Sequence, residues 1–107
     1  MFDVFKKLFG IKTTDYAQLM QEGAIILDVR TPGEFSSGHI KGSINISVDK
    51  LAHNLNKLKS KNKPIITCCA SGMRSASAKN FLQSNGYTAV HNGGAWYRLE
   101  MKLRNLD

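Results

Sequence analysis

Two adjacent cysteines and a nearby arginine are the residues of this sequence with the clearest capacity for chemistry. In TCCASGMRSASAKNF, residues 67–81, an apolar run ends in Cys68 and Cys69 and leads through Gly72 and Arg74 into a stretch typical of a helix. A loop between a strand and a helix can direct several backbone N–H groups toward its centre, and the helix N-terminus adds partial positive charge there. A cysteine at the start of such a loop is shifted toward the nucleophilic thiolate. The pattern predicts a reactive cysteine in an anion-binding loop.

The residues that follow the cysteines suit such a loop. Gly72 has no Cβ and reaches positive φ at little cost. Ser71 and Ser75 can donate hydrogen bonds or cap the helix, and Arg74 can close the loop by donating to carbonyls or nearby carboxylates. Met73 projects from the loop and is a candidate for shaping its entrance.

Alternating helices and strands are predicted to position this loop. Residues 24–29 (AIILDV) and 64–68 (PIITC) are apolar and rich in β-branched residues, as expected of buried strands. The predicted order begins with a helix over 15–22, capped by Thr13 or Thr14 and ending at Gly23, and a strand over 24–29. Next come a loop with at most one helical turn over 30–42, a short apolar run over 43–48, and a helix from about residue 49 that carries Leu51, Leu55 and Leu58 on one face. The last elements are a strand over 64–68, a helix over 75–86, a strand over 87–91 and a helix over 95–103.

Strands that alternate with helices predict an α/β fold with parallel crossovers and helices on both faces of the sheet. Ligands of such sheets bind beyond the carboxyl ends of the strands. Three informative stretches lie at such ends: Asp28 with Arg30, residues 69–74, and residues 92–94. We expect them to converge on one site.

Composition restricts the class of protein. At 107 residues, 42% hydrophobic and 21% charged, the sequence has the size and composition of one globular domain. Two adjacent cysteines cannot join distant segments, so reduced thiols are expected rather than a secreted disulfide framework. The first residues, MFDVFKKLFG, lack the apolar block of a signal peptide, and we expect a cytoplasmic location.

The net charge of +7 attracts small anions, nucleic acid and anionic lipid alike, so charge alone selects no partner. Residues 1–12 place Phe, Val and Leu at helical spacing beside lysines, which predicts a short amphipathic segment packed on the domain rather than a membrane anchor. The lysines at 57, 59, 61 and 63 lack aromatic interleaving and are interpreted as a solvated helix end. No nucleic-acid or membrane partner is expected.

Three motifs together resemble the single-domain rhodaneses, a family of sulfurtransferases. They are ILDVRTPGEFSSGHIKGSINI at 26–46, CASGMRSASA at 69–78 and NGGAW at 92–96, and the resemblance extends over about residues 13 to 104. It implies a rhodanese-like α/β domain over 13–107, with a central, mostly parallel sheet.

The resemblance also implies a site. The catalytic residue would be Cys69, which opens a six-residue loop and carries sulfur as a persulfide, moving it from an anionic donor such as thiosulfate to a thiol, a protein thiol or cyanide without a cofactor. The substrate-binding residues would be Ala70, Ser71, Gly72, Met73, Arg74 and Ser75. Asp28 and Arg30 would support the loop, and we interpret Arg30 with Glu34 as a local ion pair.

The choice of sulfur leaves an alternative open. Counted from Cys68 to Arg74, the loop has the length used by cysteine phosphatases, so a phosphatase or arsenate reductase is the rival enzyme, and a non-catalytic module that binds anions or a partner is the rival class. As the last residue of a doubly covered strand, however, Cys68 is expected in the core as an inert thiol. A phosphatase also needs an acid for its leaving group, and no dedicated acid motif is visible, although Asp28, Glu34 and Asp49 are carboxylates that could serve.

The remaining polar and aromatic candidates are interpreted as structural. Three histidines and two adjacent cysteines have no C-x-x-C or H-x-x-x-H spacing, so no metal site is predicted. His39 is expected to bond a backbone carbonyl, and Trp96 is expected to pack in the core or at its rim. Gly93 and Gly94 either let backbone approach the pocket or make the turn into the last helix.

Overall fold

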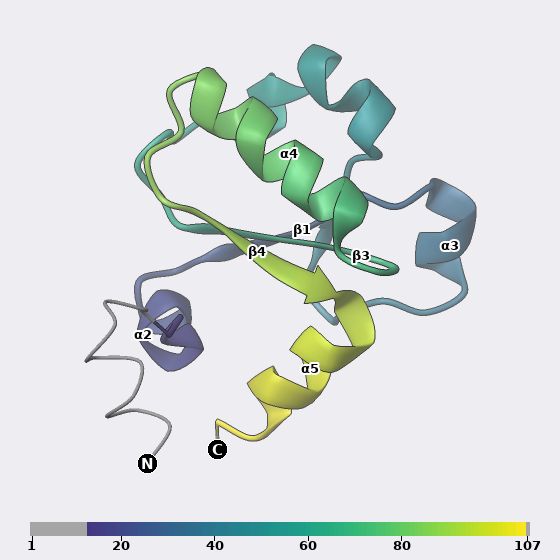
Figure 1. The fold of residues 1–107 in the computed structure, drawn as a ribbon, viewed down its shortest axis with the longest axis vertical. Coiled ribbons are helices and arrows are strands. Elements are labelled where there is room, and N and C mark those ends of the chain that lie inside the picture. Colours follow the sequence, from purple (N-terminus) through teal and green to yellow (C-terminus); the bar gives the residue numbers. More distant parts are fainter. Residues whose placement is uncertain (1–12, 107) are drawn as a thin grey trace.

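A four-stranded parallel sheet forms the centre of the computed structural model, which describes residues 13–106 (Figure 1). Its strands are β1 (Ile25–Asp28), β2 (Ile44–Asn45), β3 (Ile65–Cys69) and β4 (Val90–Ala95). They lie in the order β2-β1-β3-β4, and each neighbouring pair is parallel. The predicted parallel sheet is confirmed.

Helices cover both faces of this sheet, as predicted. Figure 1 shows α4 (Met73–Ser84) and two short 3-10 helices, η1 (Val48–His53) and η2 (Leu55–Lys57), on one face. On the other face lie α2 (Tyr16–Gln21) and α5 (Trp96–Arg104), while the single turn α3 (Pro32–Ser36) lies beyond one end of the sheet. None of the helices between residues 13 and 106 has the length and apolar composition needed to cross a bilayer.

Side-chain alternation along β1 and β3 divides the core into two clusters. One cluster faces α4 and η1 and includes the fully buried Leu27, Leu82 and Cys69. The other faces α5 and includes Ile66 and Cys68. The two cysteines therefore point to opposite faces of the sheet, and the prediction that Cys68 lies in the core is confirmed.

The predicted α-helix after residue 49 is wrong in type. The segment forms η1 and η2, which meet at Asn54, and the backbone N–H of Asn54 donates to the Leu51 carbonyl at 3.0 Å. The side-chain amide of Asn54 donates to the Lys50 carbonyl at 2.8 Å, which is the acceptor that the same residue's N–H would use in an α-helix. Leu51 and Leu58 are nevertheless buried, so the apolar spacing identified the buried face.

The third predicted strand, over 87–91, is also wrong in its bounds. The Tyr87 hydroxyl donates to the Leu58 carbonyl at 2.6 Å and the Thr88 N–H donates to the Lys61 carbonyl at 2.9 Å, so this part of the segment is bonded to the chain after η2. The strand starts at Val90 and runs through the glycines to Ala95.

A bulge explains why two glycines lie inside β4. Thr67 pairs with Asn92 but Cys69 pairs with Ala95, so β4 advances three residues while β3 advances two. Gly94 adopts φ +79, and a Cβ on Gly93 would lie 2.8 Å from Ile66 Cγ2 and 2.9 Å from the Thr67 carbonyl oxygen. The bulge brings β4 against the cysteine loop, because a Cβ on Gly72 would lie 3.5 Å from Gly94 Cα.

The first described helix is capped by a different residue from the two predicted. Asp15, rather than Thr13 or Thr14, accepts the Gln18 N–H at 3.1 Å, and a carboxylate at this position also complements the helix dipole. The helix ends before Gly23, as predicted. The predicted amphipathic segment 1–12 lies outside the described residues, and the division into 1–12 and 13–107 stays a prediction.

Candidate active site

The loop between β3 and α4 is folded around the sulfur of Cys69. The backbone N–H groups of Gly72 and Ser75 donate to Sγ at 3.0 and 3.3 Å, and the thiol lies 3.4 Å from the Ser75 hydroxyl. Gly72 holds φ +102 immediately before the first residue of α4, which confirms that the turn uses its backbone freedom. The Cys69 sulfur is therefore the atom on which the loop donors converge.

This arrangement controls the ionisation of Cys69. Burial of the side chain raises its pKa, but hydrogen bonds from the Ser75 hydroxyl and from the N–H groups of Ser75, Gly72 and Ser71 lower it. The bonds outweigh burial, and the pKa of Cys69 lies below its ordinary value. The loop thus favours the thiolate at this position without a neighbouring base.

The neighbouring thiol has the opposite environment. Cys68 packs with Ile26, Ile40, Ile66 and Leu99 on the other face of the sheet. Burial raises the pKa of Cys68 to about 12, and the negative charge of Asp28 contributes to the increase. It is therefore a protonated, apolar core residue at neutral pH.

The outer residues of the loop are accessible. Ala70 and Ser71 are exposed, and Met73 is 79% exposed at the first position of α4. Cys69 itself has no exposed surface. The sulfur is thus buried in the structure, while the residues that follow it in the loop are in contact with solvent.

Arg74 ties the first turn of α4 to α3. Its two guanidinium nitrogens donate to the two carboxylate oxygens of Glu34 at 2.7 and 3.0 Å, so the carboxylate partner expected for Arg74 is present. The bond from Arg74 and the backbone bond from Thr31 lower the pKa of Glu34 to about 2. The predicted ion pair of Glu34 with Arg30 is wrong, because Arg74 occupies both oxygens and only the Glu34 carbonyl accepts from Arg30.

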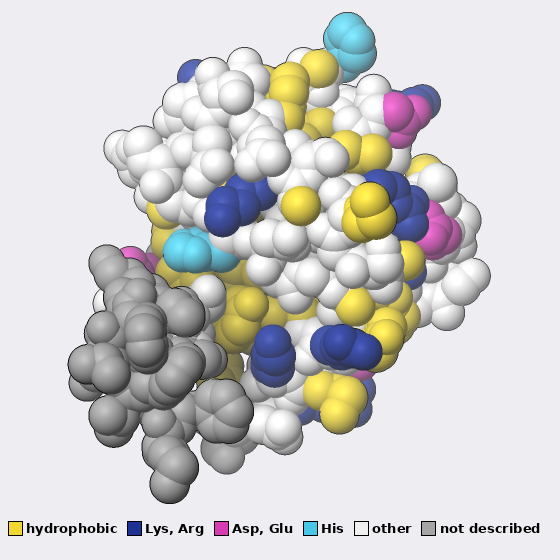
Figure 2. Space-filling view, in the orientation of Figure 1, with side chains coloured by type: hydrophobic (Ala, Val, Ile, Leu, Met, Phe, Trp, Pro, Cys, Tyr) yellow, Lys and Arg dark blue, Asp and Glu magenta, His cyan; other side chains and the backbone are white. Residues whose placement is uncertain are grey.

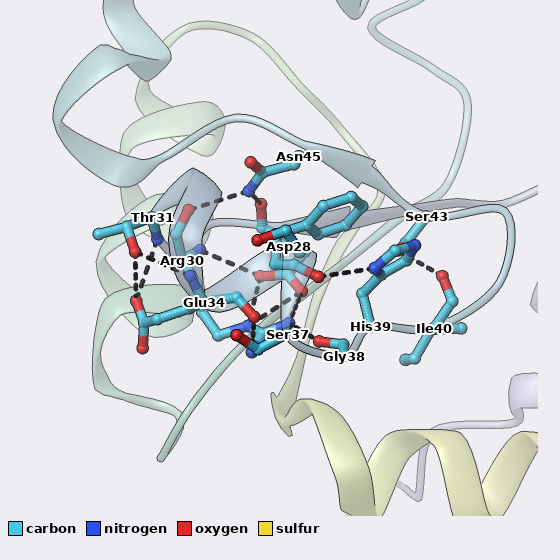
Figure 3. A network of polar contacts seen from close by, with 12 residues as sticks. Asp28, Arg30, Thr31, Glu34, Ser37, Gly38, His39, Ile40, Ser43 and Asn45 are labelled. Atoms are coloured by element: carbon cyan, nitrogen blue, oxygen red, sulfur yellow. Dashed lines mark hydrogen bonds and ion pairs between the residues drawn. The ribbon is translucent and has the colours of Figure 1, made fainter.

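Arg30 instead forms a buried pair with Asp28, drawn in Figure 3. Nε and Nη2 of Arg30 donate to Oδ1 and Oδ2 of Asp28 at 2.9 and 2.6 Å, and Nη2 also donates to the Gly38 carbonyl at 2.7 Å. Trp96 lies over the guanidinium, 4.8 Å from ring centroid to Cζ, which confirms its predicted packing role at the rim of the core. The pair therefore fixes residues 30–38 against the sheet.

Neither member of that pair has a hydrogen bond to the cysteine loop among the described residues. The Asp28–Arg30 pair and the cysteine loop are linked by the pairing of strands β1 and β3, next to which the Val29 N–H donates to the Cys68 carbonyl at 2.9 Å. Any support that Asp28 and Arg30 give to Cys69 therefore passes through the backbone. His39, in the same segment, has Nδ1 2.7 Å from the Phe35 carbonyl, as predicted.

Positive charge is distributed broadly over the molecule. Figure 2 shows Lys and Arg side chains spread among uncharged surface on the face drawn, rather than gathered into one patch. Between residues 13 and 106, no group of three or more His, Cys, Asp or Glu side chains is arranged to hold a metal ion.

Comparison with known proteins decides the family. Residues 12–95 match the sequence model of the Rhodanese-like domain. The chain belongs to the rhodanese-like family. Its relatives include the thiosulfate sulfurtransferase GlpE of Pseudoalteromonas translucida, 37% identical over 82 residues that cover 73% of this chain and 77% of that protein.

Other rhodanese-like relatives differ in length and in what is known of them. The uncharacterized protein YqhL of Bacillus subtilis is 38% identical over 69 residues, which cover 64% of this chain and 54% of YqhL, so the chain spans about half of that relative. Among solved structures, a rhodanese with anions from E. coli superposes with a TM-score of 0.65 at 31% identity, covering 69% of this chain and 88% of the other. The predicted rhodanese-like fold is confirmed.

The sequence predicted the place of Asn92 near this rhodanese-like site but not the role of its side chain. The Asn92 side chain accepts from the Ser75 hydroxyl at 2.6 Å and donates to the Gly72 carbonyl at 3.3 Å. Residues 92–94 were expected near the cysteine loop, and the structure brings them there. The signal that could have identified Asn92 is its place as the one polar side chain in that stretch, beside two glycines.

Proposed function

We propose that this chain is a sulfurtransferase that carries sulfane sulfur on Cys69 as a persulfide. The observation that carries the proposal is the convergence of the Gly72 and Ser75 N–H groups on Sγ, with a lowered pKa for the thiol. Kinship with thiosulfate sulfurtransferases supports the same reaction class.

In the first step, the Cys69 thiolate attacks the outer sulfur of thiosulfate. A new S–S bond forms to Sγ, the S–S bond within thiosulfate breaks, and sulfite leaves with the electron pair of that bond. The charge is conserved, because a thiolate and a dianion become a persulfide anion and sulfite dianion. Sulfite needs no proton to leave, so the step requires no general acid.

In the second step, an acceptor thiolate or cyanide attacks the terminal sulfur of the persulfide. The bond between the two sulfurs breaks, and its electron pair returns to Cys69 as thiolate. The N–H groups of Ser71, Gly72 and Ser75 donate to the Cys69 thiolate, and the same loop donors would stabilise the neighbouring negative charge of the persulfide. Arg74, held by Glu34, keeps the start of α4 in place.

The size of the loop favours sulfur over phosphate. The donors converge within 3.3 Å of Sγ itself, and Cys69 has no exposed surface. A donor must therefore present a terminal, unbranched reactive atom, as thiosulfate does, whereas a tetrahedral phosphate or arsenate needs a larger ring of donors. The rival use of Cys68 is disfavoured by its burial on the opposite face of the sheet and by its pKa of about 12.

The proposal includes the compartment and the partners. Two free cysteines agree with the reducing cytoplasm, where we place the protein. The net charge of +7 assists capture of an anionic donor, although salt screens this attraction beyond about 8 Å. The acceptor is a small thiol or a protein thiol.

Mass spectrometry after incubation with thiosulfate tests the proposal. We expect one added sulfur atom on the intact protein, located on Cys69 by peptide mapping. Cys69→Ser is expected to abolish the adduct, whereas Cys68→Ala, which leaves no buried hydroxyl unpaired, is expected to retain it. Sulfur on Cys68 in the parent, or turnover of a phenyl phosphate without sulfur uptake, would overturn the assignment, and absence of any turnover would favour a binding module.

A further inference from the structure

The Asn92 side chain connects three polar groups around the cysteine loop. Its Oδ1 accepts from the Ser75 hydroxyl at 2.6 Å and from the Gly94 N–H at 2.9 Å, and its Nδ2 donates to the Gly72 carbonyl at 3.3 Å. Two of these groups belong to the residues that bond Cys69 Sγ. Asn92 is therefore connected to the Cys69 sulfur by two separate hydrogen-bonded routes, one through Ser75 and one through Gly72.

The Ser75 route fixes the orientation of a hydroxyl. A serine hydroxyl has one proton to donate and two lone pairs that accept. With that proton directed to Asn92, the Ser75 oxygen accepts from the protonated Cys69 thiol, 3.4 Å away. When Cys69 is a thiolate, the hydroxyl stabilises it only by turning its proton from Asn92 to the sulfur. Ser75 is fully buried, and the other acceptor within reach of its hydroxyl is the Gly72 carbonyl at 3.1 Å, so Asn92 is the nearer of two acceptors.

The Gly72 route fixes a peptide group. The Gly72 N–H donates to Sγ at 3.0 Å while its carbonyl accepts from the Asn92 amide and from the Ala76 N–H. This glycine has a positive φ of 102° and no side chain of its own to hold it. The Asn92 amide thus adds a side-chain restraint to a peptide group that the Ala76 N–H and the Ser75 hydroxyl also hold.

We propose that Asn92 is a positioning residue that holds the Ser75 hydroxyl and the Gly72 peptide group in place around the sulfur of Cys69. The inference deepens the proposed function and rests on Cys69 as the sulfur carrier. Strand pairing does not require this side chain, since β4 pairs with β3 through the Asn92 backbone and the side chain is exposed.

The other charged or titratable groups around the site come from four elements. Arg74 on α4 is paired with Glu34 on α3, Asp28 is paired with Arg30 at the end of β1, and Cys68 precedes Cys69 on β3. The substitutions proposed below leave these groups in place, except that Cys68 is removed equally from every protein compared.

The test measures the pH dependence of alkylation by iodoacetamide in a Cys68→Ala background, where residue 69 is the only thiol. Asn92→Ala is expected to move the profile to lower pH and to speed alkylation about three- to tenfold below the midpoint, because the Ser75 hydroxyl proton that Asn92 accepts at 2.6 Å can then donate to the thiolate. Asn80→Ala, which removes an exposed asparagine from α4, is the matched control and should leave the profile unchanged. The melting temperature of Asn92→Ala should change by less than about 3 °C, as for other surface substitutions.

A double variant tests whether Asn92 acts through Ser75. The effect of Asn92→Ala on the profile should be smaller in a Ser75→Ala background, because removal of the hydroxyl eliminates one of the two routes. Asn92→Asp keeps an acceptor for the Ser75 proton, loses the donor to Gly72 and adds a negative charge, so it should move the profile to higher pH, opposite to Asn92→Ala.

Three results would overturn the inference: an Asn92→Ala profile that superimposes on the parent, an Asn92→Asp profile that does so, or full additivity with Ser75→Ala. None of these measurements uses a sulfur donor. A failure of the proposed function, seen as no sulfur adduct on Cys69, is therefore distinguishable from a failure of the role assigned to Asn92.

Discussion

Replacing Gly93 by alanine tests the packing that brings β4 against the cysteine loop. A Cβ at this position would lie 2.8 Å from both Ile66 Cγ2 and Leu99 Cδ2, and 2.9 Å from the Thr67 carbonyl oxygen. The two side chains can rotate, but the carbonyl belongs to the central strand β3 and cannot move without disturbing the sheet. Such overpacking costs about 1–3 kcal/mol. At about 2 kcal/mol, the melting temperature of a domain of this size falls by roughly 8 to 16 °C.

The sign of this effect separates packing from backbone conformation. Gly93 is not in the left-handed region, so Gly93→Ala would otherwise stabilise the protein by about 0.4–1 kcal/mol through the unfolded state. Gly33→Ala is the matched control, because a Cβ on Gly33 in α3 meets nothing within 4 Å. Urea unfolding of the two variants should give changes of opposite sign. If Gly93→Ala proves as stable as the parent, the close approach of β4 to β3 and α5 is refuted.

Three further predictions concern buried or paired charges and thiols. Asp28→Asn should lower the unfolding free energy by about 3 kcal/mol in urea titration, because Arg30 is only 4% exposed and keeps its charge, and a loss under about 1 kcal/mol would contradict a buried pair. Arg74 lowers the pKa of Glu34 from 4.5 to about 2, so the Glu34 carboxylate stabilises the fold fully above about pH 4.5. The difference in unfolding free energy between the parent and Glu34→Gln should therefore disappear as the pH falls toward 2. A difference that stays constant with pH would exclude the ion pair. The pKa of Cys68 is raised from 9.0 to about 12, so this thiol stabilises the fold fully below about pH 9 and less as the pH rises. The unfolding free energy should therefore decline more steeply at alkaline pH in the parent than in Cys68→Ala. Parallel declines in the two proteins would place the thiol outside the core.

The architecture could be predicted from the sequence because it follows from local patterns. The apolar runs at 24–29 and 64–68 have no polar face and therefore had to be covered on both sides, which predicted a parallel sheet between two helix layers. The cysteine loop was identified for a similar reason, since a glycine and an arginine between a strand and a helix restrict the backbone strongly. Strand alternation predicted that Cys68 lies in the core, and the structure confirms it. Cys69 was expected to open the loop, and it is instead the last residue of β3, buried on the opposite face of the sheet.

The parts that could not be predicted depend on tertiary contacts. Two arginines and two carboxylates near the site allow different pairings, and only the position of α3 determines that Glu34 meets Arg74 while Asp28 meets Arg30. In β4, two adjacent glycines are typical of a turn, and the sequence holds no sign that a bulge retains them in the strand. The role of Asn92 was missed for the same reason, because its partners come from α4 and the loop before it.

In this structure, backbone and hydroxyl donors favour Cys69 as a thiolate. Ultraviolet titration of thiolate absorbance in Cys68→Ala, compared between the folded protein and the same protein in urea, measures this directly. We expect a lower midpoint in the folded state, because the hydrogen bonds to Sγ exist only there. A folded-state midpoint equal to or above that of the unfolded chain would contradict it.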